Sequence, residues 1–191
     1  MATVQTKRMS AEEFYEWANR PENRHRHCDL VRGEVVEMPR PGKLHGMVCA
    51  NVVWILGNYA RQRRKGYICS NDTGVIIERG PDTVRGPDIM FFDDATTYEA
   101  VPPRFGDKPP LLAVEVLSPN DTAGKLMERI TDQLRFGTPL VWVLDPDARN
   151  VCVYRPGKEP YLIREDGELT GEDVLPDFRC KVAELFALPG Q

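Results

Sequence analysis

LLAVEVLSPND, residues 111–121, is the stretch that decides the fold. It opens with a short apolar run that a single acid, Glu115, interrupts, and Pro110 and Pro119 bound the run. A run this short between such breakers predicts a buried β-strand. A carboxylate in a buried strand is costly unless it is paired or holds a metal ion. Glu115 is therefore the first candidate for a functional residue.

Two other apolar segments accompany this stretch. Residues 85–92, RGPDIMFF, predict a second short strand with Asp88 near its start, and residues 140–145, LVWVLD, predict a third. Residues 122–136 predict a helix, with Asn120 or Asp121 as its candidate N-cap. Two acid-bearing strands followed by a helix and another apolar strand indicate a metal site at the edge of a sheet.

The remaining segments predict an α/β fold with an N-terminal helix and a β-hairpin. Ser10 and Glu13 form a capping box for the helix, and residues 29–38 form the hairpin, with Gly33 at its turn. The longest helix is expected over residues 45–65, with Gly66 ending it. Residues 79–87 read as a turn-rich link. Further strands are expected at residues 67–69, 73–78, 151–155 and 160–163, a loop at 96–110, and a short helix at 181–186.

The composition fits one domain over residues 1–191 with a substantial core, because 41% of the 191 residues are hydrophobic. The net charge of -4 gives no global basic signature of a nucleic-acid-binding protein. The densest charged cluster, RQRRK at residues 61–65, is either a solvated helix end, which we favour, or a phosphate-contacting patch.

Cysteine usage and hydropathy bear on the compartment. The five cysteines are scattered and form no CxxC pair, so we expect reduced, buried thiols in a cytoplasmic protein. No apolar stretch is long enough to cross a membrane, and the N-terminus lacks the pattern of a secretion signal. His25, His27 and Cys28 superficially suggest a zinc site, but the second ligand pair of such a site is missing.

Glu115 has two competing interpretations. Alternation along the strand puts it on one face with Ala113 and Leu117, among apolar neighbours. In the structural interpretation, its carboxylate pairs with an arginine. In the functional interpretation, Glu115 and Asp88 come together from neighbouring strands and bind Mg²⁺, a hard cation that prefers oxygen ligands. Such an ion lowers the pKa of a water molecule and offsets charge on a scissile phosphate.

The order and spacing of several motifs resemble a known family. Gly86-Pro87-Asp88, the segment EVLSPND at residues 115–121 and WVLDP at 142–146 are similar to motifs of the Uma-two family of restriction-endonuclease-like proteins, in the PD-(D/E)XK nuclease superfamily. The resemblance extends to the opening helix, the hairpin DLVRGE, His45 at the start of the long helix, the strand VCVYRP and LPDF near the C-terminus. It therefore covers nearly the whole chain.

This resemblance implies a restriction-endonuclease-like mixed β-sheet flanked by helices. It also implies that Asp88 and Glu115 bind the metal ion, Mg²⁺ or alternatively Mn²⁺. The implied reaction is hydrolysis of DNA phosphodiester bonds by metal-activated water.

The chain departs from the family pattern at its positive group and at one acid. The family's lysine, eleven residues past the strand's serine, corresponds to Arg129, and the tyrosine four residues later to Gln133. Arg129 keeps the positive charge, but arginine does not deprotonate as lysine can. Lys125, one helical turn earlier, either supplies an ammonium group or is a solvated lysine. Asp29 stands where the family has glutamate, so its assistance to the metal is expected to be weaker.

Two functional hypotheses follow. In the first, the protein is a Mg²⁺-dependent DNA endonuclease in which Asp88 and Glu115 hold the ion, Asp29 assists, and Arg129 or Lys125 stabilises phosphate charge. In the second, it is a catalytically impaired nuclease-fold protein that binds nucleic acid or a protein partner. A homodimer is plausible, because duplex cleavage requires two active sites. His45 could contact phosphate, act as an acid or base, or make a helix-start hydrogen bond, which we favour.

Overall fold

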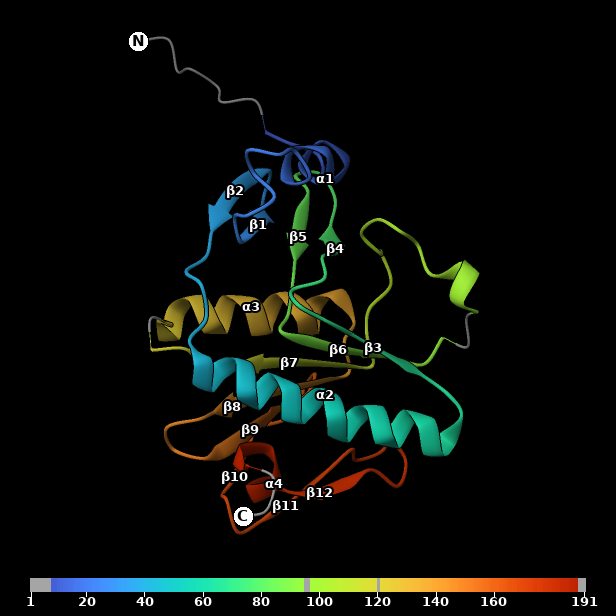
Figure 1. Ribbon diagram of the computed structural model, residues 1–191, viewed down its shortest axis with the longest axis vertical. Helices are drawn as coiled ribbons and strands as arrows, with labels where there is room; N and C mark the ends of the chain where they lie inside the picture. Colours follow the sequence, from blue (N-terminus) through green and yellow to red (C-terminus); the bar gives the residue numbers. More distant parts are fainter. Residues whose placement is uncertain (1–7, 95–96, 120, 189–191) are drawn as a thin grey trace.

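The computed structural model describes residues 8–94, 97–119 and 121–188. Its centre is a mixed sheet with the strand order β10-β9-β8-β7-β6-β3 (Figure 1). The pair β7–β8 is parallel, and the other neighbouring pairs are antiparallel. The strands of this sheet are β3 (Tyr67–Ser70), β6 (Ile89–Phe92), β7 (Leu112–Val116), β8 (Leu140–Asp145), β9 (Asn150–Tyr154) and β10 (Tyr161–Ile163). The mixed sheet and the buried strand around Glu115 are confirmed.

A second sheet has the order β2-β1-β5-β4 and lies above the central sheet in Figure 1. Its members are β1 (Cys28–Val31), β2 (Glu34–Glu37), β4 (Val75–Glu78) and β5 (Thr83–Arg85). The predicted hairpin is confirmed as β1–β2, and its turn places Arg32 (φ 50°) as well as Gly33 (φ 81°) in the left-handed region. Two left-handed residues in a two-residue loop match the twist of an antiparallel pair.

The strand predicted over residues 85–92 is wrong in extent. The chain forms β5 and β6 in two different sheets, with Gly86-Pro87-Asp88 between them. Residues 83–85, expected within a turn-rich link, are a buried strand. A small sheet from β11 (Glu168–Thr170) and β12 (Arg179–Lys181) was also not predicted. Strands of three residues are too short to show an alternation pattern.

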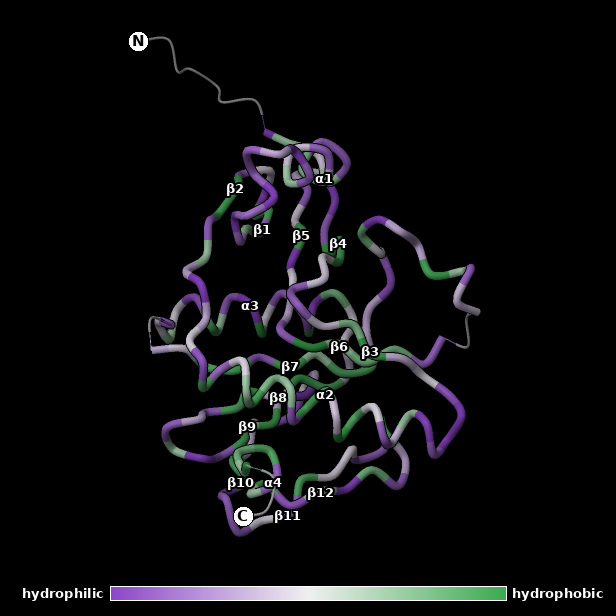
Figure 2. The backbone as a smooth tube through the Cα atoms, viewed as in Figure 1, coloured by the Kyte–Doolittle hydropathy of each residue, from purple (hydrophilic) through white to green (hydrophobic). Residues whose placement is uncertain are grey.

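The central sheet lies between helices. The helix α2 (Lys43–Arg63) packs with α4 (Val182–Phe186) against a core containing Val114, Leu144 and Trp142. On the other face, α3 (Ala123–Phe136) contributes Ile130 to a cluster with β7 and β8. Figure 2 shows hydrophobic residues concentrated along these central strands. The predicted arrangement of a sheet flanked by helices is confirmed.

Helix ends follow local chemistry with some differences from expectation. The capping box of α1 (Ala11–Ala18) is present, with Ser10 and Glu13 bonded to each other's backbone. Residue Thr122 caps α3 by accepting from Lys125 N–H, so the expected cap at Asp121 is wrong, and Asn120 lies outside the described residues. The end of α2 lies at Arg63, with Arg64 in the left-handed conformation, before the expected stop at Gly66. Among the described residues, no helix is long and apolar enough to cross a membrane.

Trp142 provides a test of the core. The residue is fully buried, its ring lies 5.4 Å from that of Phe178, and among the described residues its indole Nε1 has no hydrogen-bond partner. Trp142→Ala should lower the free energy of unfolding by about 3–5 kcal/mol, because it leaves a large cavity. Trp142→Phe should cost less, because it keeps an aromatic ring and removes a buried donor. Urea unfolding of both variants would measure this, and equal losses would contradict it.

Candidate active site

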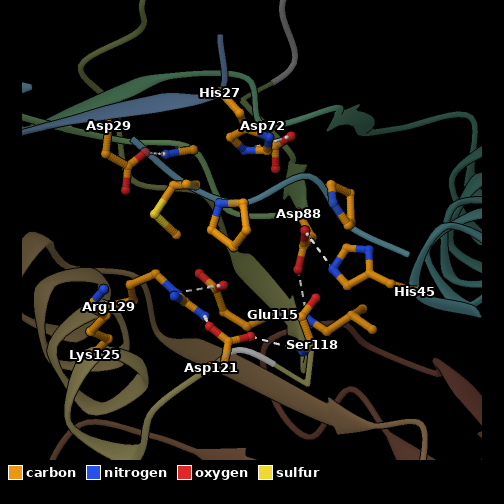
Figure 3. Close-up of a pocket in the computed structure, with 15 residues that line it drawn as sticks. His27, Asp29, His45, Asp72, Asp88, Glu115, Ser118, Asp121, Lys125 and Arg129 are labelled. Carbon is orange, nitrogen blue, oxygen red and sulfur yellow. Dashed lines mark hydrogen bonds and ion pairs between the residues drawn. The ribbon is translucent and has the colours of Figure 1, made fainter. Parts of the chain in front are cut away.

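The predicted site residues line one cavity of about 80 Å³, where α2, α3 and both sheets meet (Figure 3). Five carboxylates surround it: Asp29, Asp72, Asp88, Glu115 and Asp121. Lys125 and Arg129 approach from α3, and His45 approaches from α2. The space suits an ion with a few waters, since one water occupies about 30 Å³ in the liquid.

Glu115 reaches this cavity from the middle of β7. Its carboxylate is buried, and its Oε2 lies 3.0 Å from Nε of Arg129 on α3. Strand alternation predicts only apolar neighbours for Glu115, and this prediction is wrong, because Arg129 contacts its carboxylate. The arginine pairing of the structural interpretation is present, and it coexists with placement in a carboxylate-lined cavity.

Arg129 is held between two acids. Besides Glu115, its Nη2 lies 3.0 Å from Oδ1 of Asp121, in the loop that leads into α3. Asp121 also accepts from Ser118 N–H at 2.9 Å, which fixes the loop. The guanidinium is almost fully buried, whereas Lys125, one turn earlier, is exposed at the cavity edge. Lys125 therefore presents the more accessible positive group.

Asp88 is fixed by hydrogen bonds from two elements. Its Oδ2 accepts from Val116 N–H on β7 at 2.7 Å, and its Oδ1 lies 3.2 Å from Nε2 of His45. Ile89 pairs with Val114 in the antiparallel ladder, so Asp88 and Glu115 occupy adjacent positions at one end of that ladder. The helix-start hydrogen bond favoured for His45 is wrong, because its imidazole contacts Asp88 instead.

Asp29 enters the cavity wall from β1. It is buried, with Oδ2 3.2 Å from Nη1 of Arg85, and its Oδ1 accepts from Gly86 N–H. Arg85 also pairs with Asp132 of α3 at 2.6 Å. Asp29 is thus placed within reach of the site by an arginine that links the second sheet to α3.

Sequence reasoning missed Asp72 and its partner His27. Oδ2 of Asp72 lies 3.2 Å from Nε2 of His27, and both side chains line the cavity opposite Arg129 and Asp121 (Figure 3). Asn71 and Asp72 both have positive φ, 62° and 53°, in the turn after β3. His27, which the sequence suggests only as part of an incomplete zinc pattern, pairs with Asp72. An adjacent Asn-Asp in a turn gives no sequence signal beyond tolerance of that conformation.

The electrostatics of the cavity disfavour ionised acids. Burial raises the pKa of Glu115 to about 8; Arg129 opposes this, and the charges of Asp88, Asp29 and Asp121 add to it. Burial likewise raises the pKa of Asp72 to about 6 and raises that of Asp29. The pKa of His45 is raised as well: its burial acts against this, but the hydrogen bond and charge of Asp88 outweigh it. The cavity therefore favours binding of a cation.

His45 also forms part of a group with Asp88 and Cys49, whose candidate ligand atoms lie within 4.8 Å of one another. Cys49 Sγ lies 3.5 Å from Nδ1 of His45, while Asp88 is at Nε2. The two ring nitrogens thus have different partners, and a single ion would use only one of them. A thiol nucleophile is also disfavoured, because burial and the nearby acids raise the pKa of Cys49. In this group, His45 is the residue that contacts Asp88 and holds its carboxylate.

The residues present fit a hard divalent cation. Carboxylate oxygens converge on the cavity, and oxygen is the ligand type that Mg²⁺ prefers. Arg129 contacts only the Oε2 atom of Glu115. Each carboxylate oxygen of Asp88 has one partner, Val116 N–H on Oδ2 and His45 on Oδ1, so each keeps a lone pair for a metal ion. Arg129 would compete with such an ion for the carboxylate of Glu115.

The pH dependence of stability tests the raised pKa of Glu115. Because the folded pKa lies above the unfolded value of 4.5, the folded protein binds more protons between these values, and stability falls as pH rises from about 5 to 8. This contribution, at most about 1.4 kcal/mol per pH unit, should be absent in Glu115→Gln. In urea unfolding with EDTA, the free energy of unfolding of Glu115→Gln should rise relative to that of the wild type across this range. The contribution of Asp72 is the same in both proteins and cancels in the difference. A loss of about 3–5 kcal/mol in Glu115→Gln at every pH would instead indicate an ionised, stabilising pair with Arg129.

Comparisons with known proteins identify the family. Residues 11–183 match the Uma2 family, whose description is "Putative restriction endonuclease". The fold is similar to a crystal structure from Anabaena variabilis ATCC 29413, described as a "putative nuclease belonging to DUF820", with a TM-score of 0.78 and 21% identity over 93% of this chain and 97% of that chain. The comparison with curated proteins finds no significant match. Since the family match spans nearly the whole chain, the protein belongs to the Uma2 family.

Proposed function

We propose that the protein is a divalent-metal-dependent DNA endonuclease that hydrolyses phosphodiester bonds, with Asp88 and Glu115 as ligands of Mg²⁺ or Mn²⁺. The observation that carries this proposal is the crowding of five carboxylates around one small cavity, in a chain of the Uma2 family. Burial and mutual repulsion make these groups costly to ionise together, and a divalent cation would offset that cost.

The ligands would be held before the ion arrives. Val116 N–H and His45 fix the carboxylate of Asp88, and Arg129 fixes that of Glu115. When bound, Mg²⁺ would lower the pKa of a water molecule and offset charge on the scissile phosphate. Asp29 would assist from the cavity wall, where Arg85 holds it.

The positive groups of α3 would divide two tasks. Arg129 already contacts Glu115 and Asp121, so we assign it the orientation of Glu115 together with stabilisation of phosphate charge nearby. Lys125 is exposed at the cavity edge, and its flexible ammonium group could reach a phosphate oxygen. Arginine cannot act as the base, because it stays protonated.

A second function, binding of nucleic acid or a protein partner by a catalytically impaired nuclease fold, has one specific observation in its favour. The guanidinium of Arg129 pairs with Glu115 and Asp121 and therefore competes with a metal ion. Gln133, at the position of the family's tyrosine, is buried and accepts from Thr138 Oγ1 at 3.2 Å, away from the acids. We place this function second, because Asp88 and Glu115 are both retained.

We also propose that the protein works in the cytoplasm and as a homodimer. The five cysteines, all within the described residues, are free thiols, one buried and four half-buried, which suits a reducing compartment. A dimer would supply the two active sites that cleavage of both DNA strands requires.

Metal binding is the first test. Titration calorimetry with Mn²⁺ should give a one-site signal for the wild type that is lost in Asp88→Ala and in Glu115→Ala, because each removes one ligand. Glu159→Ala, an exposed carboxylate between β9 and β10, serves as the matched control and should bind as the wild type does. Unchanged affinity in both ligand variants would sink the proposed metal site.

Plasmid nicking with Mg²⁺ or Mn²⁺, against an EDTA blank, tests the reaction. Arg129→Lys should retain or increase nicking, because it restores the family's residue. Arg129→Ala should lower nicking by a factor on the order of a hundred or more, as loss of one preorganised donor does. A larger loss in Lys125→Ala would transfer the charge-stabilising role to Lys125.

Two outcomes of this assay would change the conclusion. Nicking by Arg129→Lys without nicking by the wild type would identify an impaired nuclease. Absence of nicking in every variant, with Mn²⁺ binding intact, would reject DNA cleavage and favour the binding function. Melting curves for each variant would separate these results from unfolding.

A further inference from the structure

We infer that a second cavity beside the acidic site is a phosphate subsite, which holds the sugar–phosphate backbone of a nucleic acid next to the scissile bond; its relation to cleavage rests on the proposed function. This cavity has a volume of about 340 Å³ and is lined from β1, from the segment before it, and from the turn after β3. The basic residues that line it are Arg24, His25, Arg26, His27 and Arg40.

The two cavities are continuous in their walls. His27, Asp29, Asp72 and Gly86 line both. The acidic cavity, at about 80 Å³, is too small for a nucleotide, whereas the second offers about four times that volume. A strand whose phosphate lies at Asp88 and Glu115 would therefore extend its neighbouring residues into the second cavity.

Charge gives the second cavity its ligand class. The protein has a net charge of -4, and five carboxylates line the acidic cavity. Nucleic-acid backbones are bound mainly by neutralising phosphates with lysine and arginine, so a substrate needs local positive charge next to the acids. Within the segment RPENRHRHC, residues 20–28, three arginines and two histidines stand against one glutamate. This segment leads directly into β1 and Asp29.

The basic side chains of the second cavity differ in whether they already pair with other groups of the protein. Arg26 is committed to the fold: it pairs with Glu37 at 2.6 Å and stacks on Trp17 with its guanidinium 5.0 Å from the ring centre. Arg40 is exposed, and one of its nitrogens donates to the carbonyl of His25 at 3.3 Å, which keeps it at the cavity. Arg24 is exposed and, within the described part of the chain, makes no side-chain hydrogen bond or ion pair. Arg24 and Arg40 are the two guanidinium groups available to phosphate.

The wall of the cavity is also suited to a nucleotide. Phe105 is half-buried in this wall, and its ring stacks on that of Phe14, a core residue only 2% exposed, with centroids 5.7 Å apart. An apolar wall next to cationic side chains offers contact for sugar or base while phosphate binds the guanidinium groups. His27, paired with Asp72 in the wall shared by the cavities, stands where the backbone would pass from one to the other.

Binding of fluorescein-labelled DNA, single-stranded and duplex, by fluorescence anisotropy in EDTA tests this inference without metal or cleavage. The double variant Arg24→Ala/Arg40→Ala should weaken binding about tenfold or more at 0.1 M salt. Its plot of log affinity against log salt should be shallower by about 1.8 units on duplex or about 1.4 on single strand, since two phosphate contacts are lost. Arg24→Lys/Arg40→Lys should restore most of the affinity, because the charge returns.

The matched control is Lys158→Ala/Arg164→Ala, which removes the same charge from exposed positions on either side of β10, at the opposite end of the molecule from β1 and β2 (Figure 1). This variant should bind within twofold of the wild type. A loss on only one form of DNA supports the subsite and assigns that form. Equal binding by the two alanine double variants, or no DNA binding by the wild type, would overturn the inference. Loss of binding in Arg24→Ala/Arg40→Ala without any nicking by the wild type would reject only the nuclease function.

Discussion

The constraint on which the site depends is the burial of the Glu115 carboxylate inside the central sheet. An unpaired charge there would be costly, and Arg129, from the helix that follows the strand, pairs with it. Arg129 in turn requires Asp121, which fixes the loop between β7 and α3 through Ser118 N–H. This chain of contacts therefore fixes the loop and the orientation of the acid, and it adds to the packing of Ile130 that places α3 on the sheet.

A second buried arginine extends this arrangement to the rest of the fold. Arg85, at the end of β5, pairs with Asp29 on β1 and with Asp132 on α3. Breaking a buried pair leaves an uncompensated charge, so these contacts are strongly coupled to the packing around them. They hold the second sheet, β2-β1-β5-β4, against α3 at the cavity. This explains how strands from two different sheets contribute acids to the same site. The basic segment before β1 is brought beside the cavity by the same connection.

Strong local patterns predicted much of this structure. The apolar run around Glu115, the capping box of α1 and the left-handed turn at Gly33 each depend on a few neighbouring residues, and each is present. What sequence reasoning missed depends on distant partners. The strand β5 is three residues long; it pairs with β4 just before it in the chain and with β1, more than fifty positions earlier. Asp72 becomes a site residue only because the turn after β3 folds over Gly86, whose missing side chain admits the carbonyl of Asp72. No local pattern reports such an approach.

The identity of residue 129 determines how the charge of Glu115 is neutralised. A lysine at this position would be a compact charge with a single ammonium, free to serve one acid or a phosphate. An arginine presents a planar fork, and here two of its nitrogens serve two different carboxylates. Compared with a lysine, Arg129 therefore strengthens the internal neutralisation of Glu115 and weakens the electrostatic demand for an external cation. Asp88 and Asp72 lie outside the arginine's contacts and keep that demand in the cavity. In the proposed nuclease, catalytic competence would depend on whether a divalent ion, with a substrate phosphate to share, binds Glu115 more favourably than one guanidinium does.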